Sequence, residues 1–134
     1  MKLKLFGALI LSICLFPGFQ CQKDTEPTTN CYKGRLEIKG ICMNYTIKLL
    51  EGAMDPNLIE RSWKDETTGI TYENVFKLGS ICTFPAGIKQ GDEFYFTIDK
   101  TPNRGDCVVC MAYYPTPAKA LSIVVSETPC QLQR

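Results

Sequence analysis

Six cysteines fall in the part of this 134-residue chain that follows residue 30, and they constrain its fold more than any other feature. They are Cys31, Cys42, Cys82, Cys107, Cys110 and Cys130. An even number of cysteines in a small exported domain is typical of a disulfide framework, here of three bridges. Each bridge restricts the unfolded chain and contributes about 2–4 kcal/mol, which helps a domain whose core is modest. The sequence therefore predicts a small domain stapled by disulfides.

Export is predicted by the first 20 residues, which have the build of a secretory signal peptide. Lys2 and Lys4 give a positive start, and residues 5–16 are apolar apart from Ser12. This apolar run is too short to cross a bilayer as a permanent span, which needs about 20 residues. We therefore expect residues 1–20 to be a removable lipoprotein signal peptide.

Cys21 directly follows this leader and is the expected lipid attachment site. The stretch Cys21-Gln22-Lys23-Asp24-Thr25-Glu26 resembles the surface-export signal of Bacteroidetes-type lipoproteins, in which a lipidated cysteine precedes Gln or Lys and acidic residues. The resemblance implies an outer-membrane protein that is held by its N-terminal lipid and displayed at the cell surface. Cys14 is a rival processing site, because Leu11-Ser12-Ile13-Cys14 fits the leading positions of a lipoprotein box better than Gly18-Phe19-Gln20.

The remainder divides into a tether and one domain. Residues 21–30 offer no apolar side chain to bury after Cys21, so they are expected to form a flexible tether. Residues 31–134 have the length of a single domain and are expected to be all-β.

Composition excludes several functions. The formal net charge is +1, which gives no concentrated basic face for nucleic acid. The chain has no histidine, which removes the usual general base, the commonest metal ligand and the usual pH switch. We expect no catalytic residues, no metal and no cofactor. The expected partners are the membrane, through the lipid, and a protein or glycan of unknown identity.

Alternation of apolar and polar residues predicts strands through most of the domain. One run contains Leu36 and Ile38, and a second spans residues 45–49. The two flank Cys42 and look like a hairpin or one long bent strand. Residues 58–63 are expected to form a strand with Ile59 and Trp63 facing inward, although Asp55-Pro56 could instead start a helix over 57–64.

Later strands follow the same pattern. Residues 70–78 would pair with the preceding run, with Ile70, Tyr72, Phe76 and Leu78 in phase and the polar Asn74 as the exception on that face. The clearest strand spans 93–99, and its expected core face is Phe94, Phe96 and Ile98. Residues 107–114 are apolar on both sides and are therefore expected to form a central strand. Pro115-Thr116-Pro117 is expected to form an exposed corner. The last strand is expected to contain Leu121, Ile123 and Val125.

Five to seven short strands of this kind close into a small barrel, fully or in part, or form a β-sandwich. The turn at Gly91-Asp92 ahead of an aromatic strand resembles the rhythm of the oligonucleotide/oligosaccharide-binding (OB) barrel. Gly40-Ile41-Cys42, the later Cys-x-x-Cys and Tyr114-Pro115-Thr116-Pro117 are similar to small Bacteroidetes lipoproteins. That second resemblance implies no particular activity.

The motif Cys107-Val108-Val109-Cys110 admits a thiol–disulfide active site, but such sites usually lie at a helix N-terminus. In a regular strand, Cys107 and Cys110 would lie about 10 Å apart on opposite faces, too far for one disulfide. Each is therefore expected to bond a different cysteine. Cys42–Cys82 is favoured as one bridge, because both residues would end strands. Zinc is disfavoured, because the other cysteines are scattered singly.

Other groups give little chemistry. The acidic pairs Asp65/Glu66 and Asp92/Glu93 are expected to be solvated in turns. Ser80 has no histidine partner. Aromatic residues that the core does not obviously take up could form a surface that stacks sugars, and we name them as the possible binding surface: Trp63, Tyr95 and Tyr114.

The sequence favours a lipid-anchored binding or structural module at the cell surface or in the periplasm. Two alternatives stay open. One is a periplasmic thiol–disulfide oxidoreductase that uses Cys107 and Cys110. The other is a small protease inhibitor that presents Pro115-Thr116-Pro117 as a rigid loop.

Overall fold

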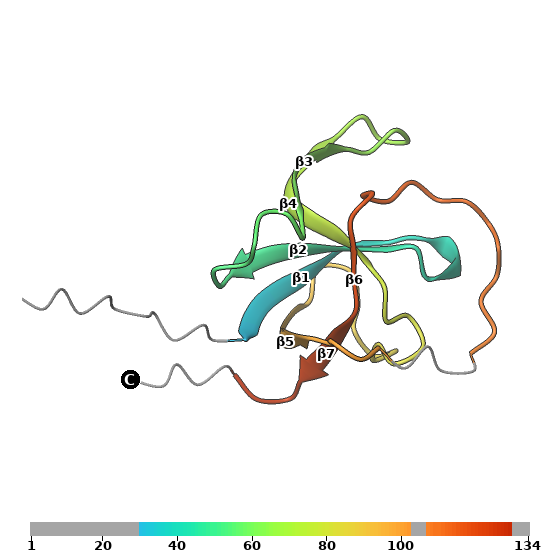
Figure 1. The fold of residues 1–134 in the computed structure, drawn as a ribbon. Coiled ribbons are helices and arrows are strands. Elements are labelled where there is room, and N and C mark those ends of the chain that lie inside the picture. Colours follow the sequence, from blue (N-terminus) through green and yellow to red (C-terminus); the bar gives the residue numbers. More distant parts are fainter. Residues whose placement is uncertain (1–29, 103–106, 130–134) are drawn as a thin grey trace, which may run out of the picture.

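The computed structural model describes residues 30–102 and 107–129 (Figure 1). Within these ranges the chain forms a single curved sheet and one short 3-10 turn. The elements are β1 (Cys31–Lys39), η1 (Ile41–Met43), β2 (Tyr45–Glu51), β3 (Glu60–Lys64), β4 (Thr71–Leu78), β5 (Glu93–Ile98), β6 (Ala120–Leu121) and β7 (Ile123–Ser126). The all-β prediction is confirmed.

The strands lie in the order β3-β4-β2-β1-β5-β7, and each neighbouring pair is antiparallel. The short β6 stands off this path and pairs in parallel with the end of β4, through Lys77 with Ala120 and Leu78 with Leu121. The sheet is not closed into a barrel by continuous strands, so the closed form of the prediction is wrong. The sandwich alternative is also wrong, because all seven strands belong to one sheet.

β1 is the centre of the sheet because it pairs with β2 on one side and with β5 on the other. Its residues alternate between partly and fully buried positions, as the polar and apolar pattern dictates. Tyr32, Leu36 and Ile38 are buried on one face. Gly34 shares that face, and a Cβ added there would lie 2.8 Å from the Phe96 ring. Glycine is therefore needed at this position for the aromatic core to close over β1.

The core is rich in aromatic rings and centres on Phe96 of β5, which is fully buried. Its ring centroid lies 5.5 Å from that of Tyr32, 5.9 Å from Phe76 and 6.1 Å from Phe94. These tilted arrangements add to the energy of burial, by about 0.5–1.5 kcal/mol per pair. The predicted core face of β5 is confirmed for Phe94 and Phe96, while Ile98 is partly buried against the same cluster.

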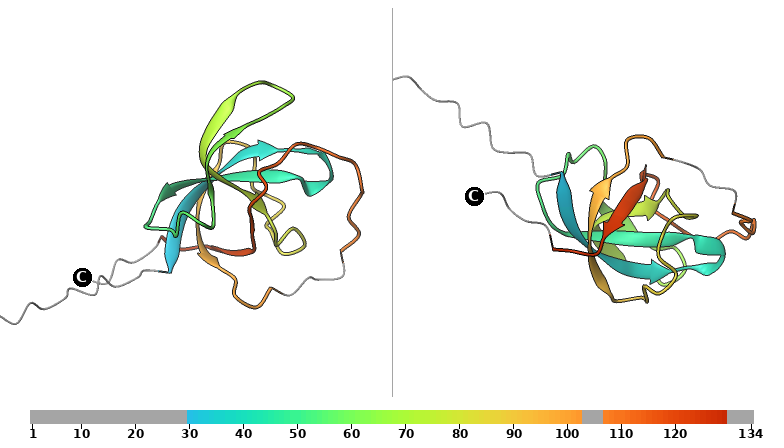
Figure 2. Two further views of the ribbon diagram at one scale, coloured as in Figure 1. Left: turned by 45° about the horizontal axis from the view of Figure 1, so that its top comes forward. Right: turned by 90° about the horizontal axis from the view of Figure 1, so that it is seen from below.

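The predicted hairpins also form. β1 and β2 join through η1 around Cys42, and β3 and β4 form a hairpin that projects from the rest of the sheet (Figures 1 and 2). Ile59 is buried, as expected, but Trp63 is only partly buried and stacks on Tyr72. The strand expected over 58–63 is shifted by one or two residues, and the helical alternative is wrong.

Burial along β4 stops alternating after Asn74, whose φ of 55° is in the left-handed region. Val75 and Phe76 are then both fully buried although they are adjacent in sequence. Ile70 lies before β4 and is 52% exposed, so it does not share the buried face of Phe76 and Leu78 with which it was expected to be in phase. Asparagine tolerates left-handed backbone better than most residues, and simple alternation does not anticipate the irregularity.

Two predictions near the end of the chain are also wrong. Residues 107–114 form no strand, and most of their side chains face solvent. Pro115-Thr116-Pro117 is not an exposed corner, because Pro117 is fully buried. The last strand is confirmed as β6 and β7, with Leu121 and Ile123 buried and Val125 packed against the core.

Candidate functional site

The part of the molecule that stands apart from the sheet is residues 107–117, which we call the strap. It runs without helix, strand, turn or bend, and forms a wide arc beside the η1 end of the β1–β2 hairpin (Figures 1 and 2). Among the described residues, no backbone group of the strap hydrogen-bonds to another backbone group. The strap is therefore a single irregular segment that lies outside the sheet.

Two disulfides fix the strap at its N-terminal half. Cys107 bonds Cys82 in the irregular loop after β4, with Cα atoms 5.5 Å apart. Cys110 bonds Cys42 in η1, with Cα atoms 5.1 Å apart. The strap is thereby tied to two loops that are themselves well separated in the sequence.

This pairing corrects part of the disulfide prediction. Cys107 and Cys110 do bond different partners, as expected, but the Cys42–Cys82 bridge is wrong. The regular strand assumed at 107–114 is absent. The prediction that Cys107 and Cys110 bond different partners was therefore correct, but the strand geometry from which it was argued does not exist. Cys31 is also disulfide-bonded. Cys130 and the expected lipid site, Cys21, lie outside the described residues.

Polar and packing contacts continue the attachment beyond Cys110. Asn44, directly after η1, uses its side-chain amide to donate to the carbonyl oxygen of Ala112 at 3.1 Å and to that of Ile41 at 2.9 Å. The Tyr114 ring packs on Gly40, where an added Cβ would lie 2.7 Å from the ring. The same turn thus holds the strap at three alternate residues, 110, 112 and 114.

The turn that carries these contacts has an unusual backbone. Cys42 and Met43 have φ values of 55° and 58°, so two successive residues other than glycine are left-handed. Each such residue costs about 1–3 kcal/mol and persists only where the surroundings hold it in place. Here the Cys42 disulfide and the Asn44 hydrogen bonds provide that support. Strain of this kind often marks a functional segment.

Between its anchors the strap exposes large apolar side chains. Val108 is 100% exposed, Met111 96% and Tyr113 78%, and Ile41 of η1 is also exposed. Single exposed apolar residues are ordinary on protein surfaces, but three within six consecutive residues of a fixed segment are a patch. Sequence reasoning missed this patch because it treated apolar composition as a sign of burial.

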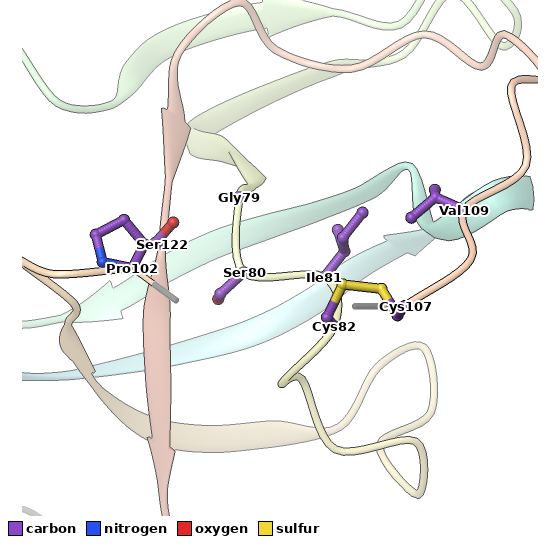
Figure 3. A pocket seen from close by; sticks show the side chains of 8 residues that line it. All are labelled: Gly79, Ser80, Ile81, Cys82, Pro102, Cys107, Val109 and Ser122. Carbon is purple, nitrogen blue, oxygen red and sulfur yellow. A yellow bond between two sulfur atoms is a disulfide. The ribbon is translucent and has the colours of Figure 1, made fainter. Parts of the chain in front are cut away.

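Two hollows lie between the strap and the body of the protein, each with a volume of about 410 Å³. In the first, the Cys82–Cys107 disulfide stands at one end and Pro102 and Ser122 at the other, with Ser80 between them (Figure 3). The second is lined by η1, the end of β4 and residues 109–113. Because of these hollows, the middle of the strap is held by its anchors more than by packing.

The chemistry of the first hollow is limited. The Ser80 hydroxyl donates to the Ile123 carbonyl oxygen at 2.8 Å and accepts from the Ile123 amide at 2.9 Å. It is buried and bound on both sides, so it is a structural tie between the β4 loop and β7. Among residues 30–102 and 107–129, no three Cys, Asp or Glu side chains gather in a way that could hold a metal ion.

The predicted aromatic surface is distributed over three elements. Trp63 is on β3 and stacks on Tyr72, with ring centroids 5.9 Å apart. Tyr95 is on β5, where it pairs with Lys33 and Ser126. Tyr114 is in the strap. The structure brings Tyr114 alone of the three to the candidate site.

Charged groups with shifted pKa values lie on the sheet. Lys33 and Glu93 form an ion pair of 2.7 Å across β1 and β5. The hydrogen bond from Lys33 lowers the pKa of the Glu93 carboxyl, and the same bond raises the pKa of Lys33. Asp65 was expected to be solvated, but it is buried in the β3–β4 turn and accepts from the Thr67 amide and the Thr68 hydroxyl.

A signal for the strap was present in the sequence. Cys107 and Cys110 lie three residues apart, and Pro115 and Pro117 follow closely. Proline cannot donate to a sheet ladder, so little length remained for regular pairing. The apolar residues between these constraints had no strand in which to be buried.

Comparison with protein-family models, with curated proteins and with solved structures found no match. Within the described ranges, no helix has the length and apolar character needed to cross a bilayer.

Proposed function

We propose that this protein is a lipid-anchored binding module outside the cytoplasm, and that the strap is its binding element for a protein partner. The observation that carries the proposal is the exposure of Val108, Met111 and Tyr113 on a segment clamped by two disulfides. A segment fixed before binding loses little conformational entropy when it binds, which favours affinity. Exposed apolar and aromatic side chains supply the contact area that interfaces require.

The location rests on separate observations. Disulfides persist in oxidising compartments, which supports a protein exported from the cytoplasm. The expected lipid on Cys21 and the export-like residues after it support attachment to the outer membrane at the cell surface. Residues 21–30 would then act as the tether that leads to β1.

For the architecture, we propose a partly open barrel of the OB kind. The pairings lead from β4 through β2, β1 and β5 to β7, and residues 120–121 return to β4 as the parallel β6. Only Ser122 separates β6 from β7. The short parallel link is the element that would complete the ring, and the projecting part of the β3–β4 hairpin lies outside it.

The disulfide pairing argues against a thiol–disulfide oxidoreductase. Such enzymes use two nearby cysteines that bond each other in turn. Here Cys107 and Cys110 each bond a partner from another loop, and a cycle between them would require both bridges to break. A glycan ligand has one observation in its favour, the Trp63–Tyr72 stack on the projecting hairpin.

The strap proposal is tested by placing a photo-cross-linking amino acid at Val108 in the native cells, with the same group at Val124 on β7 as the matched exposed control. We expect a protein adduct from position 108 that is absent from position 124. The adduct should also disappear in a Cys42→Ala/Cys110→Ala variant. Equal adducts from both positions, or none from 108, would contradict the strap as the binding element.

The anchor is tested separately by mass spectrometry of the native protein and by labelling intact cells with a membrane-impermeant reagent. Acylation of Cys21 and labelling of intact cells are expected. An unacylated chain that is protected in intact cells would contradict the proposed location without bearing on the strap.

A further inference from the structure

The strap has the features of a peptide segment that a protease can bind and cut, but whose two cut ends stay attached to the domain. We infer that it is an inhibitory loop for a serine endopeptidase with an apolar primary pocket, and that Met111 enters that pocket. This inference rests on the proposed function, because it names the class of protein partner that the strap would bind.

The first argument is the backbone. Proteases bind peptides as extended strands that add to an edge in the enzyme's cleft, through main-chain hydrogen bonds. Within the described residues, the one protein hydrogen bond to the strap's backbone from residue 107 to 117 is the contact from Asn44 to Ala112. The backbone of the strap is therefore largely unpaired and can form main-chain hydrogen bonds to an enzyme, which a strand inside the sheet cannot do.

The second argument is the side chain at the centre. Met111 is unbranched, apolar and almost fully exposed, and it lies between two anchored neighbours. Cys110 is bonded to Cys42, and the Ala112 carbonyl accepts from Asn44. Both anchors belong to the same turn, so the Met111–Ala112 peptide bond is presented with both of its sides fixed.

The third argument concerns the reaction itself. The protease serine attacks the Met111 carbonyl carbon, the C–N bond to Ala112 breaks, and the serine proton passes through the enzyme's histidine to the Ala112 amine. From an ordinary peptide, that amine would depart. Here the Cys42–Cys110 disulfide holds the Met111 side, and Asn44 together with the buried Pro117 holds the Ala112 side.

The amine consequently stays beside the ester carbonyl at a high effective concentration. It can attack that carbonyl, return its proton to the enzyme through the histidine and reform the Met111–Ala112 bond. Water competes poorly with a neighbouring amine that is held in place. The expected outcome is a long-lived complex with slow net cleavage.

The test measures inhibition of chymotrypsin, and of trypsin as the contrasting enzyme, by the purified domain with its disulfides intact. We expect the wild type to inhibit chymotrypsin and not trypsin, with slow cleavage confined to Met111–Ala112. Met111→Gly should weaken inhibition of chymotrypsin at least about 30-fold, the loss expected of a central contact residue. Met111→Lys should transfer inhibition to trypsin, whose pocket selects basic side chains.

Val124→Lys is the matched control, because Val124 is also exposed but lies on β7. It should inhibit chymotrypsin as the wild type does. Circular dichroism of each variant checks that the sheet is intact. The inference is overturned if the wild type does not slow chymotrypsin, if Met111→Lys is merely digested by trypsin, or if Val124→Lys matches Met111→Lys. If position 108 gives a cross-linked adduct in cells but the domain inhibits no protease, this inference alone is overturned. If neither the adduct nor inhibition is seen, the strap is also ruled out as the binding element.

Discussion

The sheet and the strap of this protein are held in place by different forces. In the sheet, Phe76 and Phe96 are fully buried and pack against each other, as in an ordinary protein core. In the strap, Val108 and Met111 are almost fully exposed, and two disulfides and one side-chain amide fix the backbone. The comparison shows that an apolar run need not be buried when disulfides fix the position of its backbone, as they do in the strap.

The sharpest test of this comparison sets Phe96→Ala against Met111→Ala. Loss of the Phe96 ring should lower the free energy of unfolding by about 3–5 kcal/mol, because it leaves a cavity in the aromatic core. Met111→Ala should change it by no more than about 0.5 kcal/mol, as for an exposed surface residue. Urea denaturation with the disulfides oxidised measures both. Similar losses from the two variants would mean that the strap is part of the core.

Removal of one clamp, with Cys42→Ala/Cys110→Ala, is the next largest effect. We expect a loss of about 2–4 kcal/mol in the free energy of unfolding, chiefly because the unfolded chain gains freedom. Limited proteolysis should then cut within residues 107–117 before the sheet is lost. The wild type serves as the control, and a variant that is cut first within β1 or β5 would contradict the separation of the two regions.

Gly40→Ala tests the contact between the hairpin and the strap. The added methyl would lie 2.5 Å from the Asn44 carbonyl oxygen and 2.7 Å from the Tyr114 ring, so both contacts must open. A loss of about 1–3 kcal/mol is expected from such overpacking. Gly87→Ala is the matched control, because no atom lies within 4 Å of its added Cβ. Hydrogen exchange should increase in the strap of Gly40→Ala and remain unchanged in that of Gly87→Ala.

The smallest effect concerns the solvent face of the sheet, through Glu93→Gln. The folded protein lowers the pKa of Glu93, so the ionised form contributes stability above the pKa of the unfolded chain. That contribution is lost as the pH falls through the lowered pKa of the folded state. The midpoint of thermal unfolding should therefore differ slightly between wild type and variant at neutral pH and converge in acid. A difference that grows in acid would contradict this assignment.

The residues that sequence reasoning placed correctly are those whose position depends on burial. Phe94 and Phe96 alternate with Glu93, Tyr95 and Thr97, and Leu121 and Ile123 lie on either side of Ser122. This period of two assigns all four to the core face, where they are buried. The β1–β2 hairpin followed from the same pattern, since its two runs are separated by a short turn. These positions could be predicted because the burial of apolar side chains alone determines them.

The residues that were misplaced depend on constraints that a local pattern does not carry. Ile70 is exposed because it precedes β4, in the end of the β3–β4 hairpin that projects from the sheet (Figure 1). Pro117 is buried because the strap must return to the sheet at β6. The exposure of Met111 depends on which cysteines pair, and among six cysteines the sequence allows fifteen pairings. The candidate site could therefore not be assembled from the sequence, although each of its cysteines was identified.

The central strand also sets the orientation of the molecule. β1 has 9 residues and begins at Cys31, where the tether would join, while η1 follows its other end. At about 3.3 Å per residue, those two ends lie roughly 25–30 Å apart. The views in Figures 1 and 2 agree that the strap lies at the η1 end, away from the start of β1. If Cys21 carries the proposed lipid, the chain enters the domain at the start of β1, so the exposed Met111 lies at the end of the molecule opposite the point of attachment.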